Sequence, residues 1–551
     1  EGKQMNHWDA FAVPPMRYEA QHGDRVVRCF TSRPEGLYAM FVAALLRSPQ
    51  GEALVCEGRR WTYADCDVAV GSLAARLAAH GVQHGERAIL WIGNRPEFVI
   101  ALLALQRIGA IAVPVGIREQ RPGLAYIAQQ CGAVAILVDA ELVERLPDPA
   151  EAPQLRLRLT VDETPDGVSM RGLLLDGDGW DRGTAPPPVV CDEHETAVIL
   201  YTSGTTGNPK GAMLTQSNIV HSALHYQACM RLEASDRSAL AVPASHVTGL
   251  IAVIAAMLQV GGTTVIVPAF KAESFIALLA AERVSHTLMV PAMYQLCLLH
   301  PSFAHADLNA WRTGGYGGAP MPVATIDALT TRLPQLTLIN AYGATETTSP
   351  ATMIPAGLTR EHADSVGVAL PATDIRVMDE NGRELPPGET GELWVGGPMV
   401  VPGYWGNPQA TAASFTAGYW HSGDLGSVDA AGFVRLFDRK KDMLNRGGYK
   451  VYSVEVENVL MAWPGMVEAA VLGRPCPVLG ERVHAVLHAG PECSRDTTAL
   501  QAFCAARLAD YKVPETFGWS DQPLPRNANG KVMKRVLKQA LQDTPAPAAA
   551  R

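Results

Sequence analysis

The stretch Tyr201-Thr202-Ser203-Gly204-Thr205-Thr206-Gly207-Asn208-Pro209-Lys210-Gly211 decides how this chain is organised. Its three glycines let the backbone approach a ligand closely and adopt positive φ angles. Four aliphatic hydroxyls and one ammonium group stand among them, which is a composition that suits a polyphosphate. The stretch is not an ordinary P-loop, because Pro209 precedes the lysine and Gly211 follows it. The simpler alternative is a polar turn with a solvated lysine.

The segments around this loop predict its setting. Residues 196–201 form an apolar run typical of a buried strand, and Ser217 is a candidate cap for the helix that follows. Helix and strand patterns alternate earlier in the chain, near residues 64–80, 88–92, 96–108, 111–115 and 133–138. This alternation predicts parallel sheets covered by helices.

The pattern changes in the last third of the chain. Short strands and turns between residues 375 and 396 predict a small β-barrel or sheet subdomain, and a charge cluster follows at residues 438–442. The remaining helix and strand patterns are long enough for a separate α+β domain. We therefore predict an α/β protein with a large N-terminal domain of parallel sheets covered by helices plus the small β-barrel subdomain (1–438), a hinge (439–442), a small mobile α+β lid domain (443–540) and a disordered tail (541–551).

Composition excludes several function classes. The 551 residues carry a net charge of -9, and the pI near 5.9 argues against nucleic acid as the main partner. Two apolar runs, residues 98–115 and 250–267, are interrupted by polar residues, glycine or proline, so neither is expected to span a membrane.

The ten cysteines indicate a reducing compartment. They are scattered, none forms a Cys-x-x-Cys pair, and no histidine joins them at metal-ligand spacing. We expect reduced, mostly buried cysteines and no structural zinc. The first residues also lack the apolar core of a signal peptide, so a cytoplasmic protein is expected.

Two motifs end in a carboxylate. Asn340-Ala341-Tyr342-Gly343-Ala344-Thr345-Glu346 follows an apolar strand at 336–339, so Glu346 is placed to hold Mg²⁺ and Tyr342 to stack on a base. The alternative is a plain turn with an exposed glutamate. Trp420-His421-Ser422-Gly423-Asp424 presents an aspartate that could accept both hydroxyls of a ribose, against the alternative of an ordinary surface aspartate.

Two further glycine-containing segments complete the set. Gly317-Gly318-Ala319-Pro320 lets the backbone approach a flat ligand, although such loops are usually only loops. Asn527-Ala528-Asn529-Gly530-Lys531 places a lysine just past a turn glycine, where it can stabilise charge in a transition state or simply be solvated.

These motifs, in this order, resemble the AMP-forming acyl-CoA synthetases of the adenylate-forming (ANL) superfamily, which includes fatty-acyl-CoA and 4-coumarate-CoA ligases. The resemblance runs from about Trp61 to Lys538. It implies an acid–thiol ligase that uses ATP, Mg²⁺ and CoA in two half-reactions. A carboxylate first attacks the α-phosphate to give acyl-AMP and pyrophosphate, and the CoA thiol then displaces AMP.

The resemblance also implies roles for individual residues. Phosphates would be held by Thr202, Ser203, Gly204, Thr205, Thr206, Gly207 and Lys210. The nucleoside would meet Gly318, Ala319, Asn340, Ala341, Tyr342, Asp424 and Arg439. Thr345 would touch the α-phosphate, Glu346 would bind Mg²⁺, and Lys531 would bridge the acyl carboxylate and the α-phosphate. Lys441 matches the hinge, and Gly447 and Gly448 match the glycines beside the pantetheine tunnel.

The acyl pocket would be lined by His246, Thr248 and Ala252. The sequence departs from the common pattern here, because Ser245 stands where an aromatic residue often precedes the histidine. A core histidine is the alternative for His246. The matching helix, residues 248–257, carries no charge, and an unpaired buried charge is costly. We therefore expect an acid with an uncharged aliphatic or aromatic tail.

Two rival functions remain at this point. One is an acyl-AMP ligase that loads a separate carrier protein instead of CoA. The other is an ATP-dependent regulatory protein that has lost catalysis, against which the presence of Glu346, Asp424, Arg439 and Lys531 argues. The expected partners are small molecules, with no nucleic acid and no integral membrane segment, and a homodimer is left open.

Overall fold

The structure is a computed structural model that describes residues 7–8, 10–161, 168–169, 185–202, 208–447, 449–526 and 532–542. The chain forms two compact units. The first consists of Glu1–Arg376, Trp394–His421 and Asp429–Val434, and the second of Val377–Leu393, Ser422–Val428 and Arg435–Arg551. The chain passes between units within strands β19 (Asp374–Met378), β20 (Gly391–Gly396), β22 (Tyr419–Val428) and β23 (Phe433–Arg439). The predicted hinge at 439–442 stays a prediction.

One sheet of the first unit carries the strand that leads into the Gly-rich loop. Its strand order is β11-β10-β6-β5-β7-β8-β9. The strands are β5 (Arg87–Trp91), β6 (Ile111–Pro114), β7 (Ala133–Val138), β8 (Leu157–Thr160), β9 (Val168–Ser169), β10 (Thr196–Thr202) and β11 (Lys210–Thr215). All neighbouring pairs are parallel except β10 and β11, so the expected parallel sheet is confirmed and gains one antiparallel edge.

The other large sheet of the first unit is parallel in its centre. In this unit its strands follow the order β4-β3-β13-β12-β14-β15-β16-β17-β18, and Gly367 and Val368 of β18 pair with the start of β23. The strands are β3 (Glu52–Cys56), β4 (Arg59–Thr62), β12 (Arg237–Leu240), β13 (Thr263–Ile266), β14 (His286–Met289), β15 (Thr313–Tyr316), β16 (Thr337–Tyr342), β17 (Thr352–Met353) and β18 (Gly367–Ala369). Strands β3 to β16 run parallel, and β17 and β18 continue them antiparallel.

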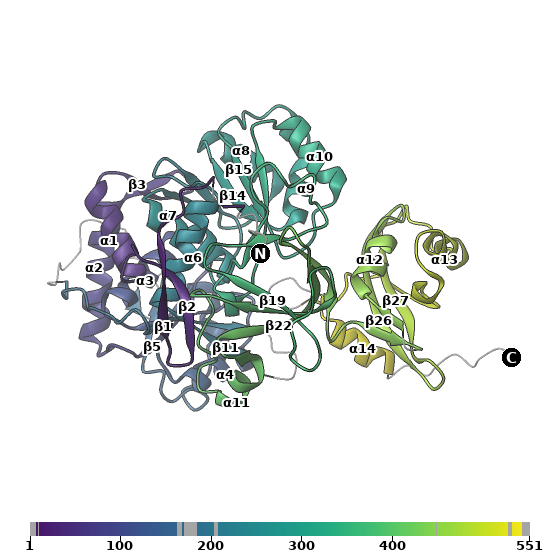
Figure 1. Ribbon diagram of the computed structural model, residues 1–551. Helices are drawn as coiled ribbons and strands as arrows, with labels where there is room; N and C mark the ends of the chain where they lie inside the picture. The colour runs from purple at the N-terminus through teal and green to yellow at the C-terminus, as the bar shows by residue number, and fades with distance from the viewer. Residues whose placement is uncertain are drawn as a thin grey trace. The chain divides into compact units, whose positions relative to one another are not determined.

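Helices cover both faces of these sheets. The main core contains α1 (Leu37–Arg47), α2 (Tyr63–Ala79), α3 (Pro96–Arg107), α6 (Gln216–Cys229), the π-helical η2 (Thr248–Ala255) and α7 (Ala256–Val260). The outer face of the β5 sheet packs on α4 (Arg121–Cys131), and α8 (Ala272–Ala281), α9 (Pro291–Leu299) and α10 (Val323–Arg332) gather around β14 and β15 (Figure 1). Shorter pieces are η1 (Ala140–Arg145), η3 (Pro301–Ala304), η4 (Thr345–Thr347), α11 (Pro408–Ser414) and β21 (Phe415–Thr416).

Side chains of strand β5 alternate between the two hydrophobic cores on either side of its sheet. Ala88 and Leu90 of β5 point into the main core, whereas Ile89 and Trp91 pack on the α4 side. Successive residues of a strand face opposite sides of the sheet, and β5 is apolar at all four of these positions because both sides are covered.

The N-terminus of α6 corrects one expectation. The cap is Thr215, whose Oγ1 accepts a hydrogen bond from the backbone N–H of Asn218 at 3.1 Å, while the Asn218 side chain accepts one from the Thr215 N–H at 3.0 Å. Ser217 lies inside the first turn, with its Oγ 3.3 Å from Nδ1 of His221. The predicted cap at Ser217 was wrong because this reciprocal capping box starts the helix earlier.

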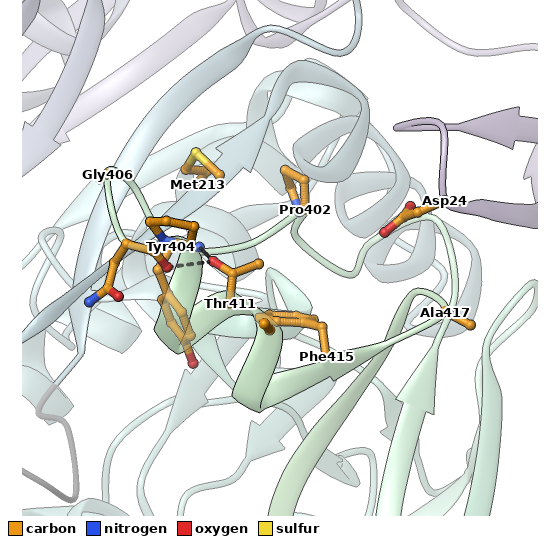
Figure 2. Close-up of a pocket in the computed structure, with 11 residues that line it drawn as sticks. Asp24, Met213, Pro402, Tyr404, Gly406, Thr411, Phe415 and Ala417 are labelled. Carbon is orange, nitrogen blue, oxygen red and sulfur yellow. Dashed lines mark hydrogen bonds between the residues drawn. The ribbon is translucent and has the colours of Figure 1, made fainter.

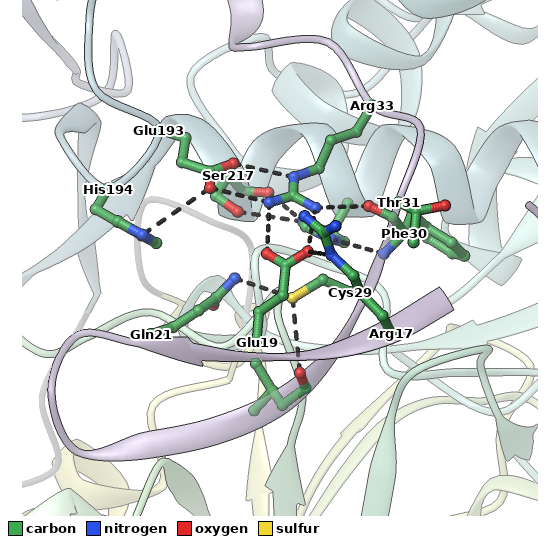
Figure 3. Close-up of polar contacts among 12 residues, drawn as sticks. Arg17, Glu19, Gln21, Cys29, Phe30, Thr31, Arg33, Glu193, His194 and Ser217 are labelled. Carbon is green, nitrogen blue, oxygen red and sulfur yellow. Dashed lines mark hydrogen bonds and ion pairs between the residues drawn. The ribbon is translucent and has the colours of Figure 1, made fainter. Parts of the chain in front are cut away.

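An N-terminal hairpin, β1 (Met16–Gln21) and β2 (Arg25–Phe30), is attached by half-buried ion pairs. Figure 3 shows Arg33 between the carboxylates of Glu19 and Glu193. Its Nη2 lies 2.7 Å from Glu19 Oε2 and 2.9 Å from Glu193 Oε1. The backbone N–H of Phe30 also donates to Nε2 of His221 on α6, at 3.3 Å. The hairpin is therefore held both by half-buried charged groups and by a buried neutral contact.

The second unit has its own sheet and core. Strands β24 (Leu444–Arg446), β25 (Tyr449–Val451), β26 (Met466–Cys476), β27 (Gly480–Ala489) and β28 (Thr516–Ser520) pair in the order β25-β24-β27-β26, with β28 beside β27. The helices are α12 (Ser453–Met461), α13 (Thr497–Ala505), η5 (Asp510–Lys512) and α14 (Lys534–Gln542). Leu460, Val483 and Leu500 lie in the separate core of this unit. Of the predicted tail, residues 541–542 belong to α14 and residues 543–551 lie outside the described residues.

The cysteines behave as expected, since all ten are free and eight are buried, with Cys191 and Cys493 half-buried. Among the described residues, no helix is both long and apolar enough to cross a membrane. Both apolar runs fold as helix, turn and strand instead.

Candidate active site

Several predicted residues follow strands of the central parallel sheet. The segment 243–248 comes after β12, Gly318 and Ala319 come after β15, and Thr345 and Glu346 come after β16. These strands are parallel, so their carboxyl ends lie at one edge of the sheet. Ligands of open α/β sheets bind at that edge.

Glu346 is buried at this edge, which removes the alternative of an exposed turn. It lies in η4 with 8% of its surface exposed. Its Oε1 accepts a hydrogen bond from the Tyr404 hydroxyl at 2.9 Å and lies 3.5 Å from Oγ1 of Thr202, the last residue of β10. The Glu346 carbonyl oxygen accepts from the Val401 N–H at 3.0 Å. A buried carboxylate beside a hydroxyl offers the hard oxygen donors that Mg²⁺ prefers.

Lys210 stands opposite Thr202 across an antiparallel pair. The two residues are register partners at the ends of β10 and β11, so the Gly-rich loop joins them. Lys210 Nζ lies 5.2 Å from the centre of the Tyr404 ring, which is a cation–π distance. The predicted phosphate residues Ser203, Gly204, Thr205, Thr206 and Gly207 lie outside the described residues.

In the segment predicted to border adenine, residues 317–320 after β15, the backbone passes close to the end of β16. A Cβ at Gly317 would lie 2.4 Å from the carbonyl oxygen of Ala341, so only glycine fits there. Gly318 has a positive φ of 78° and is exposed together with Ala319, while Tyr342 is half-buried at the end of β16.

Two other residues predicted to meet the nucleotide have structural contacts. The Asn340 side chain is buried and donates to the Ser365 carbonyl at 3.1 Å, and Ala341 belongs to the main core. Both side chains are therefore engaged in contacts within the protein.

The predicted acyl segment begins with an ordered histidine. The Thr248 backbone N–H lies 3.3 Å from His246 Nδ1, which must act as the acceptor, so the neutral ring carries its proton on Nε2. Burial lowers the pKa of His246, which favours this neutral form. A Cβ at Gly249 would lie 2.3 Å from the Pro243 carbonyl oxygen, so the start of η2 packs tightly on the loop before it.

Ala252 lies deeper in the same segment. It is fully buried in the main core, in the π-helical part that the sequence could only predict as a helix. The Ala256 N–H donates to the Ile251 carbonyl five residues back, and such π-helical turns are rare and occur frequently at functional sites.

The second unit brings Asp424 and Arg439 together. Arg439 Nε lies 3.0 Å from Asp424 Oδ1, and only 10% of the aspartate side chain is exposed. The Asp424 N–H donates to Ser422 Oγ at 3.0 Å, so serine performs this local task where threonine is commoner in the family that the sequence resembles. Asp424 is thus a buried, oriented carboxylate and not an ordinary surface aspartate.

The predicted hinge follows a strongly anchored aspartate. Asp438 is buried, accepts hydrogen bonds from the backbone N–H and hydroxyl of Ser453, and so satisfies the first N–H of α12. Burial raises the pKa of Asp438. Lys441 is exposed just beyond it, and Gly447 is exposed with a positive φ of 60°. Gly448 and Lys531 lie outside the described residues.

A pocket of about 500 Å³ lies on the other side of Tyr404. Figure 2 shows Met213, Pro402, Thr411 and Phe415 around it, with the Tyr404 hydroxyl directed away from Thr411. Tyr404 therefore separates this mainly apolar pocket from the Glu346 carboxylate.

Sequence reasoning missed two groups that distant segments bring together. Tyr404 is 58 residues from Glu346 and carries no motif of its own that marks the contact. His84, Cys191 and Glu195 also meet, with ligand atoms within 4.8 Å of one another and His84 Nε2 2.6 Å from Glu195 Oε2. The spacing of cysteines and histidines along the chain gave no sign of this trio.

Family models match most of the chain. The model described as AMP-binding enzyme matches residues 20–405, and the model described as AMP-binding enzyme C-terminal domain matches residues 455–531.

Individual relatives align over nearly their whole lengths. The chain is 34% identical over 507 residues to a feruloyl-CoA synthase of Amycolatopsis sp, covering 92% of this chain and 99% of that protein. It is 31% identical over 504 residues to the fatty acid–acyl-carrier-protein ligase ScoC of Streptomyces coeruleorubidus, covering 89% and 93%. A solved structure of o-succinylbenzoate CoA synthetase (MenE) from Bacillus subtilis with the acyl-adenylate intermediate OSB-AMP is 28% identical, with a TM-score of 0.81 and coverage of 92% and 98%.

Proposed function

This chain belongs to the AMP-binding enzyme family, and we propose that it activates a carboxylic acid with ATP and transfers the acyl group to CoA. The acid carboxylate attacks the α-phosphate, forming acyl-AMP and releasing pyrophosphate. The CoA thiol then attacks the acyl carbonyl, forming the thioester and releasing AMP. The observation that carries this proposal is the buried, hydroxyl-held Glu346 beside the strand that enters the Gly-rich loop.

The residues of the first unit suit phosphate and metal binding. We assign Glu346 to Mg²⁺, because it offers a buried carboxylate with Thr202 Oγ1 beside it. When bound, Mg²⁺ would supply neutralisation of charge on the phosphate oxygens. Lys210, held opposite Thr202, would add a fixed positive charge at the same end of β10.

The second unit would hold the ribose and complete adenylation. Ser422 Oγ holds the backbone N–H of Asp424, Arg439 pairs with its carboxylate, and that carboxylate can accept hydrogen bonds from two ribose hydroxyls. Lys531 would bridge the acyl carboxylate and the α-phosphate, Gly447 and Gly448 would border the pantetheine arm, and Lys441 would act as a hinge between the two steps.

The acid would carry an uncharged aliphatic or aromatic tail. Residues 249–257 of η2 and α7 are buried and apolar, and burying an unpaired charge beside them would be unfavourable. The similarity to a feruloyl-CoA synthase supports an aromatic acid in particular.

A carrier protein is the second candidate acceptor, because one relative is an acyl-carrier-protein ligase. CoA is favoured by the feruloyl-CoA synthase and by the Gly447-Gly448 pair, which matches the glycines of the pantetheine tunnel in the CoA-using family that the sequence resembles.

The test is a panel of carboxylic acids assayed for pyrophosphate and AMP release. We expect pyrophosphate release to require both the acid and Mg²⁺, and multiple turnovers to require CoA. Hydroxycinnamic, arylacetic and fatty acids should be compared with a dicarboxylic acid and an amino acid. Pyrophosphate release that is independent of any acid would refute adenylation. If a phosphopantetheinylated carrier protein supports turnover and CoA does not, the acyl acceptor is the carrier protein.

A further inference from the structure

We propose that Tyr404 is a positioning residue that fixes the Glu346 carboxylate against the strand entering the phosphate loop. This inference rests on the proposed function, in which Glu346 holds the metal. Tyr404 is 5% exposed, and its hydroxyl donates to Glu346 Oε1 at 2.9 Å. An ionised carboxylate can only accept hydrogen bonds, so the phenol hydroxyl is the donor in this contact.

The backbone around Tyr404 is tied to two parts of the candidate site. The Trp405 N–H donates to the Gly211 carbonyl at 2.7 Å, and the Met213 N–H donates to the Gly403 carbonyl at 3.1 Å. A few residues earlier, the Val401 N–H donates to the carbonyl oxygen of Glu346 at 3.0 Å. The segment 401–405 therefore connects β11 to η4 through backbone hydrogen bonds, and Tyr404 belongs to this segment.

The ring of Tyr404 also meets Lys210, the other charged group proposed for this end of β10. Lys210 Nζ lies 5.2 Å from the ring centre, while the hydroxyl at the ring's edge contacts Glu346. One rigid side chain thus contacts both the proposed metal ligand and the proposed phosphate-binding lysine. Because Tyr has few rotatable bonds and this one is packed against Phe415, it can hold these groups in register.

A purely structural role makes a different prediction. If Tyr404 only filled space beside Phe415 and the pocket of Figure 2, removing its hydroxyl would change stability without changing metal affinity. Tyr404→Phe separates the two roles, because it keeps the ring and its contact with Lys210 while deleting the donor to Glu346. The matched control is Tyr63→Phe, which removes a buried hydroxyl that donates to the Gly262 carbonyl at 2.8 Å, away from the candidate site.

The primary measurement is Mn²⁺ affinity by electron paramagnetic resonance, in the presence of a non-hydrolysable ATP analogue. We expect Tyr404→Phe to weaken Mn²⁺ binding about tenfold or more, a typical cost of losing one hydrogen bond to a charged group, and Tyr63→Phe to leave it unchanged. The Mg²⁺ concentration for half-maximal pyrophosphate release should rise in parallel. Measurements are made at a temperature where thermal melts show both variants folded.

A double-mutant cycle decides whether Tyr404 acts through Glu346. In a Glu346→Gln background, Tyr404→Phe should cause little further loss of Mn²⁺ affinity. Equal losses in both backgrounds, or Mn²⁺ affinity in Tyr404→Phe that matches the control, would overturn the proposal. Failure of the proposed function itself looks different, because the wild-type protein would then release no acid-dependent pyrophosphate.

Discussion

Glu346 in the first unit and Asp424 in the second are both buried carboxylates, yet the groups that orient them differ in charge. Oε1 of Glu346 meets the hydroxyls of Tyr404 and Thr202, whereas Oδ1 of Asp424 meets the Arg439 guanidinium at 3.0 Å. A hydroxyl orients a carboxylate without adding a charge, and a guanidinium offsets its charge. The first arrangement suits a metal ligand, and the second suits an acceptor for neutral hydroxyls such as those of ribose.

The largest expected effect is on the rate of acyl-AMP formation, and it distinguishes Lys531 of the second unit from Lys210 of the first. Lys531→Ala should slow acyl-AMP formation about 10²- to 10³-fold, as expected for a group that stabilises transition-state charge. Lys210→Ala should mainly raise the KM for ATP, because this lysine is assigned to phosphates that are already charged in the ground state. Single-turnover acyl-AMP formation, followed at a series of ATP concentrations, measures both the rate and the dependence on ATP. A Lys531→Ala variant with the wild-type single-turnover rate would contradict the assignment.

Glu346→Gln tests the metal side of the comparison. It removes a charged ligand and keeps the side-chain size, so Mg²⁺ affinity should fall by about 10- to 100-fold, comparable to other losses at metal sites. Pyrophosphate release at low Mg²⁺ should fall accordingly and recover in part at high Mg²⁺. A Mg²⁺ titration that coincides with that of the wild type would show that Glu346 does not bind the metal.

Asp424→Asn tests the ribose side, with a smaller effect. The amide keeps one acceptor oxygen but loses the charge that strengthens hydrogen bonds to ribose, so the KM for ATP should rise about tenfold. The Mg²⁺ dependence should stay that of the wild type, which distinguishes this variant from Glu346→Gln. The comparison fails if both variants change the Mg²⁺ titration equally.

A neutral buried histidine and a half-buried, ion-paired glutamate can be compared in the same way, through the pH dependence of the free energy of unfolding. Burial lowers the pKa of His221 from 6.5 to about 4, while hydrogen bonding to Arg33 lowers that of Glu19 from 4.5 to about 2. For both groups the unfolded chain binds the proton first, so stability is lost as pH falls. The loss linked to His221 spans about pH 6.5 to 4, and the loss linked to Glu19 spans about pH 4.5 to 2.

Chemical denaturation at pH 7.5 and 5.5 measures the first of these windows. His221→Gln should reduce the loss of unfolding free energy between pH 7.5 and 5.5. The reduction should be partial, because burial also lowers the pKa values of His22 and His225. His305→Gln, at an exposed histidine, is the control and should leave the slope unchanged. An unchanged slope in His221→Gln would show that protonation of this ring is not coupled to unfolding.

The sequence predicted those parts of the fold in which periodicity reflects burial. Helices α2 and α3 and strands β5 to β7 were placed within a few residues, because their apolar positions repeat at the spacing of one or both buried faces. The α6 cap was misplaced because Thr215, Ser217 and Asn218 all have capping side chains, and only the local hydrogen bonds select Thr215.

The site divides in the same way. Glu346 and Asp424 could be proposed from the sequence because each belongs to a short contiguous motif, and the structure shows that both carboxylates are buried. Tyr404 was missed because its contacts with Glu346 and Lys210 join residues 58 and 194 positions apart, and tertiary folding alone creates them. The π-helical turn of η2 was missed for another reason, since a uniformly apolar segment has no periodicity that reveals its hydrogen-bond register.

That π-helical turn has a consequence for how this protein can change. A bond from the Ala256 N–H to the carbonyl five residues back means that η2 accommodates more residues per turn than an α-helix of the same length. Loss of one codon within 248–255 could restore α-helical winding without displacing the strands on either side. The residues before the deletion would then rotate relative to α7, and Thr248 and Ala252 would present different surfaces. Under the proposed acyl-pocket role of Thr248 and Ala252, a change in the length of this segment, as well as side-chain replacement, would alter which acid fits.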